Sequence, residues 1–158
     1  EKPAVLLAAS LKIGARLGGA SVEDADRLYD FGMHIGVAFQ LKDDLLDVYG
    51  NAKVFGKNIG GDILCNKKTY MLIKALEHAN ADQHNQLNSW INAETFQPAE
   101  KIAAVTELYD RIGVKAVCEN KILEYSNRAM ESLAAVSIAE EKKEELKKII
   151  ENLIHREV

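Results

Sequence analysis

Proline is scarce in this sequence, where Pro3 and Pro98 are the only two among 158 residues. Alternating runs of β-branched residues are also missing, whereas apolar residues recur at every third or fourth position. That spacing is typical of amphipathic helices and argues against a β-sheet protein. We therefore predict an all-α fold, interrupted by one long glycine-rich loop between Gly50 and Gly61.

The lack of long apolar runs, of paired cysteines and of strong net charge argues against several classes of protein. No apolar run approaches the ~20 residues that a membrane-spanning helix needs, so no membrane span is expected. The two cysteines, Cys65 and Cys118, form no CxxC pair, which favours reduced thiols and a cytoplasmic location. The net charge of −4 argues against a broad surface for nucleic acid. With 47% hydrophobic and 28% charged residues, the chain suits one globular domain.

The apolar period and the capping residues predict where the helices lie. We expect helices at about 3–17, 22–49, 66–79, 82–91, 98–110 and 113–135, followed by a last helix. Capping boxes are predicted at Ser21–Asp24 and Ser137–Glu140. In the last helix we expect Glu144 and Lys148 to pair across one turn.

Gly32 and Gly36 lie four positions apart inside the second predicted helix. Each glycine costs roughly 1 kcal/mol of helix propensity, so close packing against a neighbouring helix is the expected compensation. We expect this contact to lie within the bundle rather than between subunits.

An acidic stretch stands out in the same helix: FQLKDDLLDVYG, residues 39–50. On a helix, Asp43 and Asp47 lie one turn apart, and Asp44 lies about 100° around the axis. The carboxylates repel each other, and more strongly when partly buried. One interpretation is a solvated acidic stripe. The other is a site for a divalent cation such as Mg²⁺, because the flanking residues are apolar and leave only a narrow polar sector.

The sequence GKNIGGDILCNKK follows this helix. A P-loop is excluded because the glycine spacing is wrong and Asn58 stands where Ser or Thr should bind the metal. Lys57 is either an ordinary loop lysine or the cation of a glycine-rich flap that closes over a metal-bound phosphate.

A family resemblance rests on the following residues: Phe39-Gln40-Leu41-Lys42-Asp43-Asp44-Leu45-Leu46-Asp47, Gly56-Lys57, Gly61-Asp62 and Asn66-Lys67. They resemble the second of two aspartate-rich motifs in trans-isoprenyl diphosphate synthases (polyprenyl synthetases), with the loop that follows it. Residues from Lys2 to Ala20 are similar to the preceding helix of that family. The resemblance extends to about Ala79, and beyond it only the helical character agrees.

The resemblance implies an antiparallel all-α helical bundle of the isoprenoid (terpenoid) synthase type. Residues 1–158 would be the C-terminal portion of a single polyprenyl synthetase domain, and therefore an incomplete bundle. In that family two acidic motifs face each other and hold an allylic diphosphate through three Mg²⁺ ions. The implied reaction is ionisation of the allylic substrate and condensation with isopentenyl diphosphate. A homodimer is implied for the intact protein.

The resemblance also assigns metal ligands by position. Asp43 would be the direct Mg²⁺ ligand of this motif, while Asp44 and Asp47 would help directly or through water. This assignment is consistent with the physical interpretation of the acidic stretch, because a bound cation relieves the repulsion among the three carboxylates.

The substrate-binding residues follow from the same comparison of positions. Lys2, Lys57 and Lys67 would hold the allylic diphosphate and stabilise the leaving group, which makes them the catalytic residues. Gln40 would line the allylic site, and Phe39 would lie near the isopentenyl unit.

This sequence departs from the family pattern in two ways. Lys2-Pro3 stands where the family usually has Lys-Thr, and the first of the family's two aspartate-rich motifs does not occur in these residues. We therefore expect the 158 residues alone to be inactive. Two alternatives stay open: a related terpene cyclase, disfavoured by the helix of Lys2 and the GK and NK dipeptides, and a non-catalytic helical subunit or interaction module that retains the motif.

Overall fold

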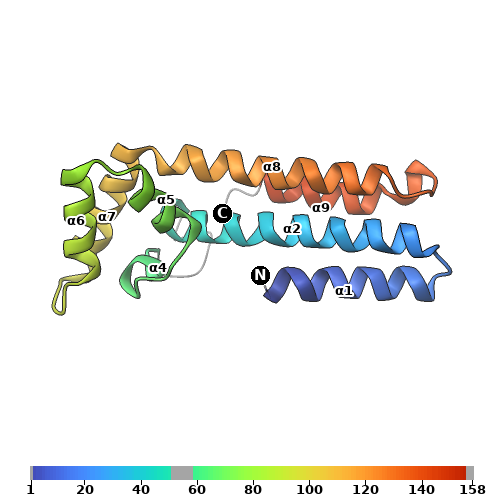
Figure 1. Ribbon diagram of the computed structural model, residues 1–158, viewed down its shortest axis with the longest axis horizontal. Coiled ribbons are helices and arrows are strands. Elements are labelled where there is room, and N and C mark those ends of the chain that lie inside the picture. The colour runs from blue at the N-terminus through green and yellow to red at the C-terminus, as the bar shows by residue number, and fades with distance from the viewer. Residues whose placement is uncertain (1, 51–58, 156–158) are drawn as a thin grey trace. The chain divides into compact units, whose positions relative to one another are not determined.

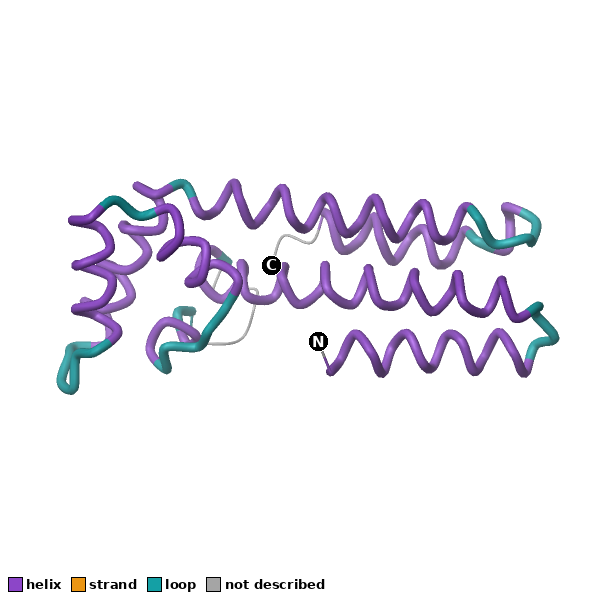
Figure 2. The backbone as a smooth tube through the Cα atoms, viewed as in Figure 1, coloured by secondary structure: helices purple, strands orange, loops and turns teal. Residues whose placement is uncertain are grey.

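The structure is a computed structural model that describes residues 2–50 and 59–155. Its helices are α1 (Lys2–Leu17), α2 (Val22–Tyr49), α4 (Gly61–Leu64), α5 (Tyr70–His78), α6 (Ala81–Ile91), α7 (Pro98–Ile112), α8 (Val114–Ala134), the 3₁₀ helix η1 (Glu140–Lys142) and α9 (Glu144–His155). Within the described ranges there is no strand (Figure 2). The predicted all-α fold is confirmed.

The chain divides into two compact units, Glu1–Lys42 with Asn120–Arg156, and Asp43–Glu119. The first unit contains α1, η1, α9 and most of α2 and α8. The second contains α4 to α7 with the last turns of α2 and the first turns of α8. Because α2 crosses the boundary between Lys42 and Asp43, its acidic turns belong to the second unit.

The first unit is a bundle of long helices in which α1 and α2 run antiparallel, as do α8 and α9 (Figure 1). Its core is a single apolar cluster of seven buried side chains: Phe31, Ile35, Ala38, Ala129, Leu133, Ile150 and Leu153. These residues come from α2, α8 and α9, and Leu11 of α1 packs against them. The helical period of each segment places its apolar stripe toward this cluster.

Gly32 and Gly36 are both buried against α1. A Cβ atom on Gly32 would lie 2.6 Å from the Cα of Ala8, and one on Gly36 would lie 2.6 Å from the Cα of Ala4. Real Cβ atoms do not approach other atoms so closely, so only glycine lets the two backbones approach to this distance. The predicted close packing within the bundle is confirmed.

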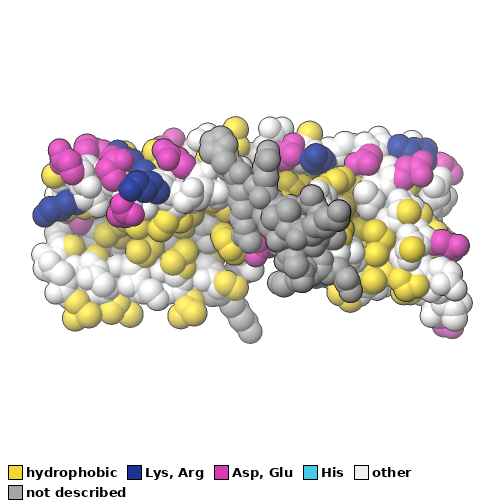
Figure 3. Space-filling view, turned by 180° about the vertical axis from the view of Figure 1, so that it is seen from behind, with side chains coloured by type: hydrophobic (Ala, Val, Ile, Leu, Met, Phe, Trp, Pro, Cys, Tyr) yellow, Lys and Arg dark blue, Asp and Glu magenta, His cyan; other side chains and the backbone are white. Residues whose placement is uncertain are grey.

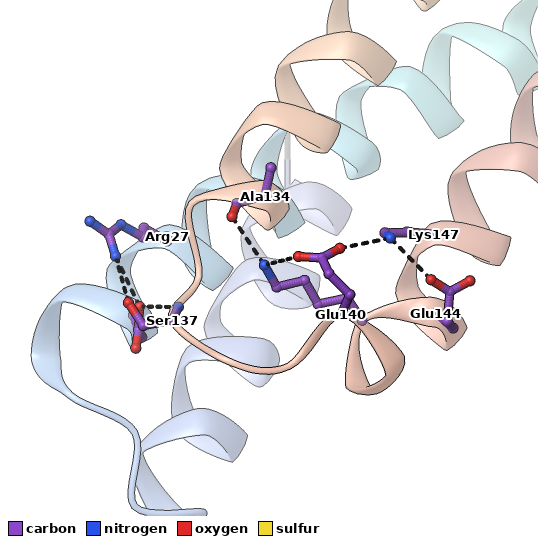
Figure 4. Close-up of polar contacts among 8 residues, drawn as sticks. Arg27, Ala134, Ser137, Glu140, Glu144 and Lys147 are labelled. Carbon is purple, nitrogen blue, oxygen red and sulfur yellow. Dashed lines mark hydrogen bonds and ion pairs between the residues drawn. The ribbon is translucent and has the colours of Figure 1, made fainter.

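The two capping boxes predicted from sequence are only partly present. Ser21 Oγ accepts a hydrogen bond from the N–H of Asp24 (3.0 Å), as expected. The carboxylate of Asp24 instead accepts from the N–H of Ser137 (2.9 Å) and from Arg27 (3.0 Å). Ser137 therefore joins two distant segments and does not cap the last helix, which begins only at Glu144 (Figure 4).

The predicted pairing of Glu144 with Lys148 is wrong. Lys147 contacts Glu144 (3.0 Å) and Glu140 (2.9 Å) (Figure 4). Lys148 contacts Glu145 instead. The 3₁₀ turn before α9 brings Glu140 within reach of Lys147, which the assumption of one continuous helix could not show. Charged side chains gather over α9, and hydrophobic side chains form a band below them (Figure 3).

The second unit is built from shorter helices around α7, which packs against α4, α5 and α6. Asn80 and Gln83 form a full capping box at the start of α6. Pro98 occupies the first turn of α7, and Gly113 ends that helix with a left-handed φ of 82°. These local signals explain why short segments hold defined ends.

A helix predicted for residues 66–79 is shorter in the structure. Helix α4 covers Gly61–Leu64, and α5 begins only at Tyr70. Thr69 caps α5 by accepting from the N–H of Leu72 (3.2 Å). The intervening residues form an irregular segment that contains Lys67, and this segment proves central to the candidate site.

Candidate active site

The last turns of α2 carry three half-buried carboxylates, those of Asp43, Asp44 and Asp47. The apolar residues between and just after them are buried: Leu45, Leu46 and Val48. The helical period therefore turns the apolar side chains to the core and leaves the carboxylates in a narrow polar sector. Repulsion within that sector calls for a nearby cation.

Lys67 supplies one such cation. Its Nζ lies 2.8 Å from Oδ1 of Asp44 and 2.7 Å from Oδ2 of Asp62, so one ammonium bridges two carboxylates. Partial burial acts to lower the pKa of Lys67, but the hydrogen bonds to both carboxylates raise it overall. The ammonium is consequently charged at any physiological pH.

Two of the three aspartates in this sector, Asp44 and Asp47, have raised pKa values. Partial burial raises the pKa of Asp44, against the opposing effect of Lys67, and the charge of Asp62 adds to the rise. Burial also raises the pKa of Asp47, although the N–H of Asp62 opposes it. Ionising these groups is costly, so an additional cation near them would be favoured.

Asp47 fixes the segment that follows the glycine-rich loop. Its Oδ2 accepts from the N–H of Asp62 (2.8 Å), and its carbonyl accepts from the N–H of Gly60 (2.6 Å). Gly60 has a left-handed φ of 86°, and a Cβ there would meet the side chain of Ile102 at 2.7 Å. Glycine is required at this position, and the resulting turn places α4 beside the end of α2.

Asp62 is the residue that the sequence analysis missed. It appears there only as part of the Gly61-Asp62 dipeptide, without a role. In the structure its carboxylate shares Lys67 with Asp44, and its N–H binds Asp47. Its place in the matched Gly61-Asp62 dipeptide marked it as a candidate, but the sequence did not indicate its partners.

The structure brings together only some of the site residues that were predicted from sequence. Lys67 and Asp44 lie together, as described above. Phe39, 46% exposed, and Gln40 lie on the part of α2 that belongs to the first unit. Lys57 and the side chain of Lys2 lie outside the described residues.

The donor set fits a hard divalent cation. Carboxylate oxygens are the ligands that Mg²⁺ prefers, and it commonly takes only one or two of them together with water and phosphate oxygens. The ammonium of Lys67 already lies between two of these carboxylates. In the part of the chain that the structure describes, no three His, Cys, Asp or Glu side chains are arranged around a common metal position.

Among the described residues, no helix is both long enough and apolar enough to cross a membrane.

Comparison with known proteins identifies the family. A model of the polyprenyl synthetase family matches residues 1–109. A short chain isoprenyl diphosphate synthase of Methanothermobacter thermautotrophicus is 33% identical over 157 residues, which are 99% of this chain and 47% of that protein. A geranylgeranyl diphosphate synthase of Methanosarcina mazei is 47% identical over 77 residues, 49% of this chain and 24% of that protein.

Solved structures of prenyl diphosphate synthases also match this chain. A crystal structure of a geranylgeranyl pyrophosphate synthase matches with a TM-score of 0.89 and 32% identity, over 98% of this chain and 48% of that one. Another, from Corynebacterium glutamicum in complex with isoprenyl diphosphate and magnesium, has a TM-score of 0.80 and 31% identity over 90% of this chain and 40% of that one.

This chain belongs to the polyprenyl synthetase family and has the all-α isoprenoid synthase fold. The similarity extends well past Ala79, where the motifs recognised from sequence ended. The chain spans about half the length of the curated relatives that it matches along most of its own length.

Proposed function

We propose that this chain forms the diphosphate-binding wall of a prenyl transferase of the farnesyl, geranylgeranyl or polyprenyl diphosphate synthase type. The reaction would condense an allylic diphosphate with isopentenyl diphosphate by ionisation and condensation. The observation that carries the proposal is the Asp44–Lys67–Asp62 bridge beside Asp47. It places carboxylates for metal ions next to a cation for phosphate.

Asp43, Asp44 and Asp47 would hold Mg²⁺, of which the intact site would contain three. Bound Mg²⁺ would supply neutralisation of the charge that develops on the leaving diphosphate. The raised pKa values of Asp44 and Asp47 support this assignment, because such carboxylates gain most from a cation.

Lys67 would serve two partners in turn. Without substrate its ammonium neutralises Asp44 and Asp62. With Mg²⁺ held by the carboxylates, the half-exposed ammonium would be available to donate to phosphate oxygens. Lys2 and Lys57 would complete the set of cations around the diphosphate.

Phe39 and Gln40 would contact the hydrocarbon parts of the substrates. Phe39 borders an open apolar groove in the first unit, together with Ile35, Ile149 and Leu153. Apolar surfaces of this kind protect a carbocation from water.

Further properties of the intact protein stay predictions. We expect a cytoplasmic homodimer, and we expect the 158 residues alone to lack prenyl transfer because they contain one aspartate-rich motif. Prenyl transfer assays on the intact protein and on the 158 residues alone would test whether the shorter chain is inactive.

The decisive experiment is a prenyl transfer assay on the intact protein, with isopentenyl diphosphate, an allylic diphosphate and Mg²⁺. We expect chain elongation that depends on the metal and falls by about 100-fold or more in Asp44→Asn. Diphosphate release without elongation would indicate a cyclase. The absence of any reaction would overturn the proposal in favour of a non-catalytic subunit.

A further inference from the structure

Lys101 of α7 is a buried cation with unusual surroundings. The residue is 1% exposed, which is rare for lysine, and α7 places it in the interior of the second unit. Its Nζ donates to Oδ1 of Asn66 (2.8 Å) and lies 4.2 Å from the ring centroid of Phe96. Among the described residues, this ammonium forms no ion pair with a carboxylate.

Such an arrangement is costly to maintain. A buried ammonium with only a neutral acceptor and an aromatic ring recovers part of its lost hydration but lacks a counter-ion. Burial lowers the pKa of Lys101 accordingly. An apolar side chain of the same length would fill the same space without the free-energy cost of burying a charge. Packing alone therefore does not explain why the residue is a lysine.

Asn66 is the residue that Lys101 holds, and its backbone is strained. It is the one residue other than glycine in the described ranges with positive φ, at 51°. Its side-chain amide bonds on both sides: Oδ1 accepts from Lys101, and Nδ2 donates to the carbonyl of Ile91 (2.9 Å). These two bonds attach the irregular segment to α7 and to the end of α6.

Lys67 is the next residue in the chain. Its N–H donates to the carbonyl of Asp62 (3.0 Å), and its side chain then reaches Asp44 and Asp62. Lys101, Asn66 and Lys67 also line one small cavity of about 20 Å³, enough for a single water. A half-exposed lysine has many rotamers, so the position of its backbone decides whether its ammonium meets both carboxylates.

We propose that Lys101 is a positioning residue that acts through Asn66 to aim Lys67 at Asp44 and Asp62. The catalytic meaning of this role rests on the proposed function of Lys67 as a diphosphate ligand. The geometric part does not, because it concerns the free protein.

The test is competitive acylation of lysines with acetic anhydride in metal-free buffer, followed by mass spectrometry. The rate at Lys67 is divided by the rate at the neighbouring, exposed Lys68, which serves as an internal control. In Lys101→Met we expect this ratio to rise about fivefold or more, because Lys67 leaves its ion pairs. The melting temperature should stay equal or increase, since a buried unpaired charge is removed.

A second variant keeps the test informative if Lys101→Met folds poorly. Asn66→Gly retains access to positive φ but removes the side-chain link, and it should raise the same ratio. Combining both substitutions should add little, because they break one connection. Lys74→Met, which removes a lysine of α5 in the same unit, is the matched control and should leave the ratio unchanged.

Two failures can be told apart. An unchanged acylation ratio in both variants would overturn the positioning role of Lys101. A changed ratio in a protein that binds no pyrophosphate with Mg²⁺ would support the positioning role and count against the proposed function. If both hold, Lys101→Met in the intact enzyme should lower kcat for prenyl transfer.

Discussion

Lys143 in the first unit and Lys101 in the second are both almost fully buried, at 2% and 1% exposed. Lys143 donates to Glu140 (2.8 Å) and to the carbonyl of Ala134 (3.0 Å). The Glu140 pKa is lowered to about 2, chiefly by the hydrogen bond to Lys143. Lys101 has an amide and an aromatic ring instead, and burial lowers its pKa.

Two aspartates of α2 show the same contrast. The N–H of Ser137 holds the pKa of Asp24 below its ordinary value, against the effect of burial and with help from Arg27. For Asp44, burial outweighs the help of Lys67, and the pKa is raised. The first unit therefore satisfies its buried charges, whereas the second retains charges that a ligand could stabilise. Functional sites commonly have this second character.

The largest expected effect concerns the second unit. In Asp44→Asn, binding of Mg²⁺ with pyrophosphate should weaken by about 100-fold in the intact protein, because a carboxylate of the proposed metal site loses its charge. Isothermal titration calorimetry measures this affinity. The melting temperature should not fall, since a partly buried carboxylate is removed.

The matched control is Asp30→Asn, which removes an exposed carboxylate from the same helix. It should leave both the affinity and the melting temperature unchanged. If Asp44→Asn instead destabilised the protein while binding stayed intact, the contrast between the two units would be wrong.

The next largest effect concerns packing in the first unit. Gly36→Ala should lower the free energy of unfolding by about 1–3 kcal/mol, because its Cβ would overlap α1. Gly14→Ala meets nothing within 4 Å and should raise it by up to about 1 kcal/mol through helix propensity. Urea denaturation measures both. Equal effects from the two substitutions would contradict the close contact.

A smaller effect should appear in how the free energy of unfolding depends on pH. The lowered pKa of Asp24 contributes stability above the ordinary value of 3.8, and this is lost as pH falls through the folded-state value. The raised pKa of Asp44 works oppositely: the free energy of unfolding falls as pH rises from 3.8 through the folded-state value.

Asp24→Asn should therefore cost more stability near neutral pH than in acid, whereas Asp44→Asn should gain more near neutral pH. Urea denaturation at about pH 3 and about pH 7 measures, for each variant, the slope of its stability change against pH. Slopes of the same sign would remove the distinction between the two aspartates.

The smallest effect is expected at the surface of α9. Lys147→Met removes ion pairs to Glu140 and Glu144, whose side chains are 63% and 53% exposed. Exposed pairs are largely screened by water and salt, so the melting temperature should hardly change. A large drop that high salt abolishes would show that the network stabilises the bundle.

Much of the fold could be predicted because helices depend on local spacing. The bounds of α1 and α2, the proline at the start of α7 and the close packing at Gly32 and Gly36 all follow from residues near each other in the chain. Some predictions that were wrong were local, such as the pairing of Glu144 with Lys148, whereas another involved a distant partner. Ser137 meets Asp24 rather than capping the last helix, and neither residue carries a local signal of that contact.

The candidate site also has a part that could be predicted from sequence and a part that could not. A helix with apolar residues between its aspartates already predicts the narrow acidic sector of Asp43, Asp44 and Asp47. Lys67 was predicted as a site residue only through resemblance to a family, and there as a ligand of the allylic diphosphate; its ion pair with Asp44 is visible only in the structure. Asp62 was missed as a partner because a single aspartate after two glycines has no local period that assigns it a direction.

Short-range patterns along the chain are enough to predict most of the helices, the acidic sector and the family. Two contacts could not be predicted in this way: Asp62 and Asp44 share one ammonium, and Lys101 reaches Asn66 beside it. The physical reason is that these contacts depend on how α2, α4 and α7 pack within the second unit. Burial and electrostatic shifts arise from that packing and cannot be read from spacing along the chain.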